Sequence, residues 1–205
     1  MRKRNIALIL AASMMATFAF GGTTAFAAEE GETDSVTVGI MADPENMGPW
    51  SGMSMGRIAV LFTTYEYLIT REDGVAYGVL AKSWDEVDPK TYDVELYDYI
   101  HDAEGNPLTA SDVVFSFESA IATKNYGKLS VIDSVTATDD YHVEFKFNKD
   151  LEIGEFENVM LECAIVTQAA YEASPDQMAT TPVGTSAYLV DSYVPGSEIV
   201  MKDTG

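Results

Sequence analysis

The chain has 205 residues, of which 33 are Asp or Glu and 12 are Lys or Arg, so its formal net charge at pH 7 is −21. Such an acidic surface disfavours binding to nucleic acid or anionic lipid, because both require a positively charged footprint. The single cysteine, Cys163, excludes an internal disulfide. With 47% hydrophobic residues, the chain has enough apolar side chains to build a core.

The first 27 residues predict a cleavable export signal. Basic residues at positions 2–4 precede an almost wholly apolar run from Ile6 to Phe20, and Ala25-Phe26-Ala27 forms a small-x-small cleavage site. A membrane anchor is the alternative, but the run is shorter than the about 20 residues that span a bilayer. Cleavage after Ala27 removes three basic residues, leaving 9 against 33 acidic ones, a net charge of −24. We expect a periplasmic or otherwise extracytoplasmic mature protein.

The first part of the mature chain shows strand, loop and helix patterns in turn. Residues 36–40 alternate apolar with small or polar side chains, which predicts a strand. Residues 41–56 are rich in proline and glycine and predict a loop. Apolar residues at helical spacing over 57–69 predict a helix with one buried face, and residues 71–74 predict a turn.

The middle of the chain has a well-marked helix start. Alternation over 92–96 predicts a strand, and a polar loop follows at 101–107. Thr109 is placed to cap a helix, and Asp112, three residues later, is placed to reciprocate the cap. Two alternating runs over 135–147, separated by a polar turn, predict a β-hairpin.

The last part of the chain predicts short elements. Residues 156–166 indicate a helix and then a buried strand, and residues 169–173 indicate a short helix. A loop opens at Pro182, and a final strand pair turns within residues 192–199. The mixture of elements predicts an α/β fold.

No pattern in the sequence points to catalysis, a metal or a cofactor. His101 and His142 lack the spacing of a zinc site, which needs three or four converging ligands. The acidic loop 98–106 lacks the ligand spacing of a calcium-binding helix–loop–helix. Cys163 lies among apolar residues and is predicted to be a buried small hydrophobe rather than a nucleophile. We therefore expect a protein that is not an enzyme.

Three stretches carry a family resemblance. They are residues 65–96 with GVLAKSW at 78–84, NPLTASDVVFSFESA at 106–120, and TPVGTSAYLVDSYVPGSEIVM at 181–201. The second resembles the run Thr-Pro-Leu-Thr-Ala-x-Asp-Val-Val-Phe-Ser of the bacterial extracellular solute-binding proteins, family 5. This is the group that binds dipeptides, oligopeptides and nickel. All three stretches occur in the order and spacing of that family across nearly the whole mature chain.

The resemblance implies a fold and a domain order. The fold would be periplasmic-binding-protein-like, of type II and the dipeptide-binding-protein kind. Residues 28–62 would begin lobe I, residues 63–180 would form an inserted subdomain, and residues 181–205 would return into lobe I. It also implies that the fold is incomplete and truncated, with the second lobe missing. A ligand clamped between two lobes gains affinity from both walls, so we expect this chain alone to bind weakly or not at all.

The resemblance also implies a function. The protein would be the substrate-binding component of an ABC importer, a monomer that captures peptides and delivers them to the membrane permease subunits. Asn46 would hydrogen-bond a peptide backbone, and Trp50 would either stack on a ligand side chain or plug its own loop. Gly184 and Thr185 would lie near the crossover, more for backbone geometry than for contact. The alternatives are nickel, haem, oligosaccharide or opine as the solute, a non-functional fragment, or a secreted hydrolase.

Overall fold

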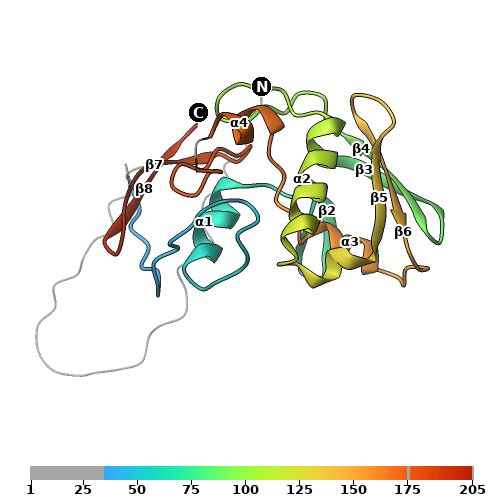
Figure 1. Cartoon of the computed structure of the whole chain (residues 1–205), viewed down its shortest axis with the longest axis horizontal. Coiled ribbons are helices and arrows are strands. Elements are labelled where there is room, and N and C mark those ends of the chain that lie inside the picture. Colours follow the sequence, from blue (N-terminus) through green and yellow to red (C-terminus); the bar gives the residue numbers. More distant parts are fainter. Residues whose placement is uncertain (1–34, 175, 205) are drawn as a thin grey trace, which may run out of the picture. The chain divides into compact units, whose positions relative to one another are not determined.

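The computed structural model describes residues 35–174 and 176–204, and Figure 1 shows its helices and strands coloured along the chain. The chain divides into two units, Met1–Val38 and Gly39–Gly205. All described helices and strands belong to the second unit. The predicted export signal, residues 1–27, lies outside the described residues.

The strand predicted at residues 36–40 is wrong. Val36 and Val38 are exposed, at 79% and 73% of their full surface, and residues 35–40 form no strand. An alternating sequence becomes a strand only where a neighbouring segment takes up its backbone N–H and C=O groups. Among the described residues, no segment pairs with this one. The alternation therefore records a strand preference that no described partner satisfies.

Helix α1 spans Arg57–Thr64, so the predicted helix begins where expected but ends before residue 69. The backbone becomes extended at Tyr65, and Glu66 forms a bridge with Ile165. Leu68 and Ile69 are apolar because they are buried in an extended segment. Apolar spacing alone does not distinguish a buried extended segment from a continued helix.

A tight hairpin follows, made of β1 (Ile69–Glu72) and β2 (Val75–Gly78). The turn predicted at 71–74 is confirmed. Asp73 and Gly74 have φ of 49° and 81°. Two-residue hairpin loops of this kind favour Asp-Gly, because both central residues need positive φ.

Four antiparallel strands form the main sheet, in the order β3-β4-β6-β5. The predicted strand at 92–96 and the predicted hairpin at 135–147 are confirmed as β4 and β5–β6. Val94 lies opposite Val143 across the β4–β6 pair, and both side chains are buried. The strands are β3 (Ala81–Asp88), β4 (Thr91–Leu96), β5 (Ile132–Ala137) and β6 (His142–Phe147).

Helix α2 (Ala110–Thr123) packs along the sheet, mainly against β5 and β6 (Figure 1). Its predicted cap is confirmed, because the Thr109 backbone N–H donates to the Asp112 carboxylate at 2.8 Å. The same carboxylate accepts the Gln168 backbone N–H at 2.8 Å, which joins the start of α2 to the start of α4. A short 3₁₀ helix, η1 (Gly127–Val131), connects α2 to β5.

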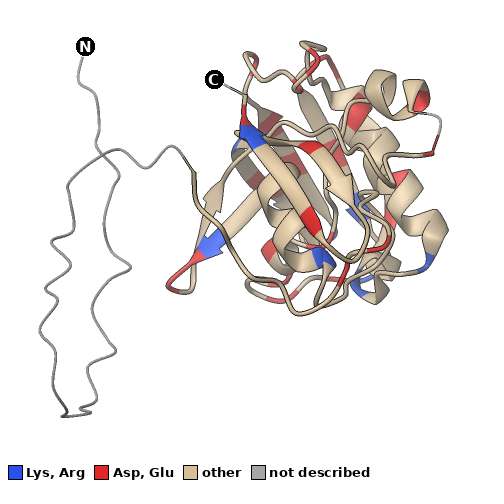
Figure 2. Ribbon diagram, turned by 90° about the vertical axis from the view of Figure 1, so that its left-hand side faces the viewer, with Lys and Arg blue, Asp and Glu red and all other residues tan. Residues whose placement is uncertain are grey.

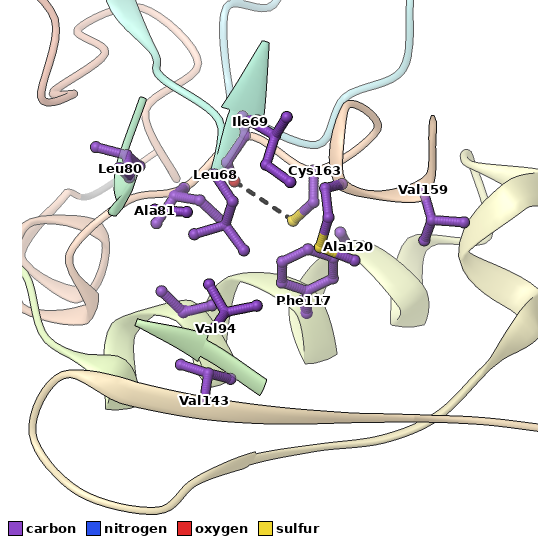
Figure 3. Packing of buried hydrophobic residues seen from close by; sticks show 14 of the residues in the cluster. Leu68, Ile69, Leu80, Ala81, Val94, Phe117, Ala120, Val143, Val159 and Cys163 are labelled. Carbon is purple, nitrogen blue, oxygen red and sulfur yellow. Dashed lines mark hydrogen bonds between the residues drawn. The ribbon is translucent and has the colours of Figure 1, made fainter. Parts of the chain in front are cut away.

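The main core lies where α2 meets the sheet and the segments around it. Figure 3 shows Phe117 and Ala120 of α2 close to Cys163, with Val94 and Val143 of the sheet beside them. Cys163 is a free thiol without solvent exposure, and burial raises its pKa well above the ordinary value. The prediction of a buried small hydrophobe is confirmed.

The remaining elements are short. Helix α3 (Glu155–Met160) is followed by a buried stretch, residues 163–167. Its β-pairing among the described residues is a single isolated bridge between Ile165 and Glu66, so the strand predicted there is wrong. The stretch is apolar because the core encloses it, not because a ladder pairs with it. The predicted short helix and final strand pair are confirmed as α4 (Gln168–Ala173) and β7 (Tyr188–Val194) with β8 (Glu198–Asp203).

A second, smaller apolar cluster joins α1 to β7 through buried Met47, Val60 and Val190. None of the helices among the described residues has the length and hydrophobicity of a membrane-spanning segment. Acidic residues, red on the ribbon in Figure 2, recur along the strands and loops of the second unit, where basic residues, in blue, are sparse.

Candidate functional site

The candidate site starts from residues 41–56, hereafter the 41–56 loop, because the sequence places a solute contact there. Trp50 anchors it in the core with only 4% of its surface exposed. The ring lies 5.8 Å from Phe115 and 4.9 Å from Tyr171 between centroids, and its Nε1–H donates to the Ala164 carbonyl at 3.0 Å. These contacts match the second alternative for Trp50, in which the ring is buried and closes its own loop. Stacking of Trp50 on a ligand stays a prediction.

Two further side chains fix the backbone of the 41–56 loop. The amide nitrogen of Asn125 donates to the Trp50 carbonyl at 2.9 Å, and the Tyr65 hydroxyl donates to the Met47 carbonyl at 3.0 Å. Burial raises the pKa of Tyr65 well above its ordinary value, so it remains a neutral donor. The Met47 N–H in turn donates to Ala179 at 2.8 Å. Hydrogen bonds from three other segments therefore hold the part of the loop from Met47 to Trp50 in place.

Asn46 is half-buried within the loop. Its Oδ1 accepts the Gly48 backbone N–H at 2.8 Å, and its own backbone N–H donates to the Pro44 carbonyl at 2.6 Å. The carbonyl end of the Asn46 amide is thus used within the loop. Donation from Nδ2 is what this side chain can offer to a carbonyl or carboxylate of a solute.

Asp43 ties the 41–56 loop to the β7–β8 hairpin. Its carboxylate accepts the Tyr193 hydroxyl and the Gly196 backbone N–H, and also the Glu45 N–H at 2.7 Å. The hydrogen bond from Tyr193, followed by those from Gly196 and Glu45, lowers the pKa of Asp43. The loop is therefore held by a residue 150 positions away in sequence as well as by its neighbours.

Gly184 and Thr185 lie where the chain returns past the end of α1. Gly184 packs against the Thr64 carbonyl, and its own carbonyl accepts the Ala103 N–H at 3.0 Å. The Thr185 hydroxyl donates to the Glu66 carboxylate at 2.7 Å. Burial raises the pKa of Glu66, and the bond from Thr185 opposes that rise. Gly184 thus packs closely against the end of α1, and Thr185 partners a half-buried acid, while solute contact by either residue stays a prediction.

Thr185 also lines a hollow of about 300 Å³, and a larger one of about 660 Å³ lies at the end of the main sheet. Of the four predicted site residues, only Thr185 lines either of these two hollows. Asn46 lines neither of them. The smaller hollow is lined by Glu66, Val79, Tyr99, Ile100, His101 and Thr185. The larger is lined by Lys82, Glu95, Leu96, Tyr97, Asp98, Tyr99, Asp139, Asp140, Tyr141 and His142.

Sequence reasoning did not identify Asp43, Tyr65 or Arg57, although all three hold the 41–56 loop. Arg57 donates to the carbonyls of Pro44 and Asn46, both at 2.9 Å. A signal was present for Arg57, since it is one of only two arginines after residue 27. Asp43 and Tyr65 carry no such signal in a chain with many acids and tyrosines. Among the described residues, no three His, Cys, Asp or Glu side chains come together to hold a metal ion.

With this geometry established, the profile of bacterial extracellular solute-binding proteins, family 5, middle region, matches residues 76–204. The match covers more than half of the chain, and the chain therefore belongs to this family. Members are substrate-binding proteins of ABC importers that work outside the cytoplasm, and the family includes binders of peptides and of nickel.

Individual relatives agree with the family assignment. Nickel-binding protein NikA of Staphylococcus aureus is 28% identical over 136 residues, which are 65% of this chain and 26% of NikA. The ABC transporter substrate-binding protein CtaP of Listeria monocytogenes matches with a TM-score of 0.68 and 28% identity, over 79% of this chain and 35% of CtaP. The oligopeptide-binding protein AppA of Bacillus subtilis, solved with a nonapeptide, matches with a TM-score of 0.70 and 22% identity, over 79% and 34%.

These matches confirm the predicted fold class, an α/β periplasmic-binding-protein fold of which part is present. The chain spans about a quarter of the length of NikA and about a third of the two solved relatives. The described residues thus correspond to a portion of the family fold.

Proposed function

We propose that this protein captures peptides outside the cytoplasm and delivers them to the permease of an ABC importer, without catalysing a reaction on them. The family match over residues 76–204 carries the proposal. The likeness to AppA, which was solved with a nonapeptide, supports peptide as the solute. A peptide presents regularly spaced carbonyls, and a donor such as Asn46 Nδ2 suits them.

A nickel complex is the second candidate, because nickel-binding protein NikA is 28% identical to this chain over 136 residues. The described residues offer no cluster of three metal-ligating side chains, so direct coordination by them is not expected. Nickel would then arrive already chelated by a small molecule, and the chain would contact that chelator through hydrogen bonds and packing.

The proposal includes a location and a domain order. Residues 1–27 direct export and are cleaved after Ala27, and the mature protein acts as a monomer. Residues 28–62 and 181–205 belong to lobe I, and residues 63–180 form the inserted subdomain. The contact between Gly184 and Thr64 supports this division, because it joins the chain segments at both proposed boundaries.

Deletion of the gene in its own host tests the function whatever the length of the native protein. We expect uptake of radiolabelled tri- to pentapeptides to fall, and to recover when the gene is supplied on a plasmid. Normal peptide uptake with lost nickel uptake would establish the second candidate instead. Normal uptake of both solutes would refute both candidates.

A further inference from the structure

The guanidinium of Arg57, the first residue of α1, donates hydrogen bonds to the 41–56 loop. Its Nε donates to the carbonyls of Pro44 and Asn46, both at 2.9 Å, and its Nη1 donates to the carbonyl of Ser51 at 2.8 Å. One side chain thus binds three carbonyls spread over eight residues of the loop. The helix start lies close enough for this because residue 56 is glycine, where a Cβ would meet the Ala42 carbonyl at 2.5 Å.

Arg57 makes these bonds in a strongly acidic chain without pairing with an acid. The sequence has 33 Asp and Glu residues, yet none of the ion pairs among the described residues includes Arg57. The planar guanidinium fixes the directions of its N–H groups, whereas a lysine ammonium is a single compact donor centre. The fixed directions of the Arg57 N–H groups therefore suit the three loop carbonyls, and a lysine at this position would not reproduce the three hydrogen bonds.

The bonds from Nε straddle a strained turn. Glu45 has φ of 58°, a left-handed conformation that is uncommon for a residue with a Cβ. The Asn46 N–H donates back to the Pro44 carbonyl at 2.6 Å, which closes a three-residue turn around Glu45. Three-residue turns with positive central φ are rare and strained, and they persist only where surrounding contacts impose them. Arg57 binds the carbonyls on both sides of this residue.

We propose that Arg57 is the positioning residue of the solute site, holding the strained turn at Glu45 so that the Asn46 amide faces the solute. This role rests on the proposed function, because it assigns the 41–56 loop to solute contact. The half of the loop after Asn46 has its own anchors in Trp50 and Met47. The half before it depends on Arg57 and on Asp43.

The first test measures backbone order in the full chain carrying Arg57→Lys. We expect amide hydrogen exchange at residues 45–48 to accelerate about ten-fold, from the loss of charged hydrogen bonds, while exchange in β4 and β6 stays unchanged. Arg71→Lys is the matched control, because Arg71 is an exposed arginine that donates to the Asn158 side chain and not to the 41–56 loop among the described residues. Equal loop exchange in Arg57→Lys and the unaltered protein would overturn the proposal.

The second test measures peptide uptake in the deletion strain, with matched amounts of each protein. We expect Arg57→Lys to restore less uptake than the unaltered gene or Arg71→Lys. Adding Glu45→Gly to Arg57→Lys should recover part of it, because glycine adopts positive φ without strain. Uptake by Arg57→Lys equal to that of the unaltered protein would overturn the role. If the unaltered gene supports no peptide uptake, the proposed function fails, and the exchange test still decides whether Arg57 holds the loop.

Discussion

The backbone of Gly184 lies so close to Thr64 that a Cβ at position 184 would be 1.9 Å from the Thr64 carbonyl oxygen. The two residues are far apart in sequence, and each stands at the edge of a proposed domain boundary. Their contact brings the end of α1 beside the returning chain. The Thr185–Glu66 hydrogen bond lies immediately next to it.

Replacing Gly184 by alanine should therefore destabilise the fold. A methyl group cannot occupy a site 1.9 Å from a backbone oxygen, so one segment must shift. We expect the free energy of unfolding to fall by about 1–3 kcal/mol, the usual cost of overpacking. Urea denaturation measures the change. Gly127→Ala is the matched control, since a Cβ at Gly127 meets nothing within 4 Å, and an equal loss in both variants would contradict the close contact.

Substitution of Trp50 separates its packing from its hydrogen bond. Trp50→Ala should lower the free energy of unfolding by about 3–5 kcal/mol, because a buried ring is removed. Trp50→Phe keeps an aromatic ring but removes the indole N–H that donates to the Ala164 carbonyl, which then keeps only the weaker bond from the Cys163 thiol among the described residues, and should cost about 0.5–1.5 kcal/mol. Chemical denaturation followed by circular dichroism provides both values. A stability unchanged by Trp50→Ala would show that the ring is not the anchor of the loop.

Asp102 should make the free energy of unfolding depend on pH in the acid range. Burial alone would raise its pKa, but hydrogen bonds from Thr167, Asn106 and Glu104 together lower it below the ordinary value of 3.8. Because the folded-state pKa is depressed, this stabilisation is complete above pH 3.8 and is lost as the pH falls through the folded-state value.

Asp102→Asn should remove the stabilisation that the ionised Asp102 carboxylate provides. At pH 7 we expect it to lower the free energy of unfolding by about 1.5–3 kcal/mol, the usual worth of a hydrogen bond to a charged group. Urea denaturation of both proteins between pH 7 and pH 3 measures the difference. The gap in stability should narrow below pH 3.8, and a gap that widens there would contradict a lowered pKa.

The hydrogen bond from the Thr185 hydroxyl to the Glu66 carboxylate predicts that substitutions at Thr185 change the pKa of Glu66. Burial raises the pKa of Glu66, and the Thr185 hydroxyl limits the rise by donating to the ionised form. Thr185→Val should therefore raise the pKa of Glu66 further, whereas Thr185→Ser should leave it near its original value. Carbon-detected NMR of the Glu66 carboxyl reports this pKa, and a lower value in Thr185→Val would refute the assignment.

Elements with local chemistry were predictable from the sequence. The Thr109–Asp112 cap, the Asp73-Gly74 turn and the β5–β6 hairpin each depend on residues close together in the chain, and each is confirmed. The errors lie where distant segments decide the outcome. Residues 36–40 alternate but have no described pairing segment, and α1 stops because Glu66 pairs with Ile165.

The candidate site was less predictable for the same reason. The resemblance pointed to the 41–56 loop, but its anchors come from positions such as Asn125, Ala164 and Tyr193, which spacing does not connect to it. The burial of Trp50 follows from three distant contacts that no local pattern encodes. Solute contact by Asn46 and Thr185 stays a prediction.

Photocrosslinking of a labelled peptide in intact cells tests most directly whether this protein captures peptides through the 41–56 loop. A tripeptide carrying a benzophenone group would be irradiated with cells expressing the full chain, and the labelled residues would be mapped by mass spectrometry. Label within the 41–56 loop, reduced by an excess of unlabelled peptide, is the predicted result. Absence of label from the loop, with label only at other sites or none on the protein, would contradict it.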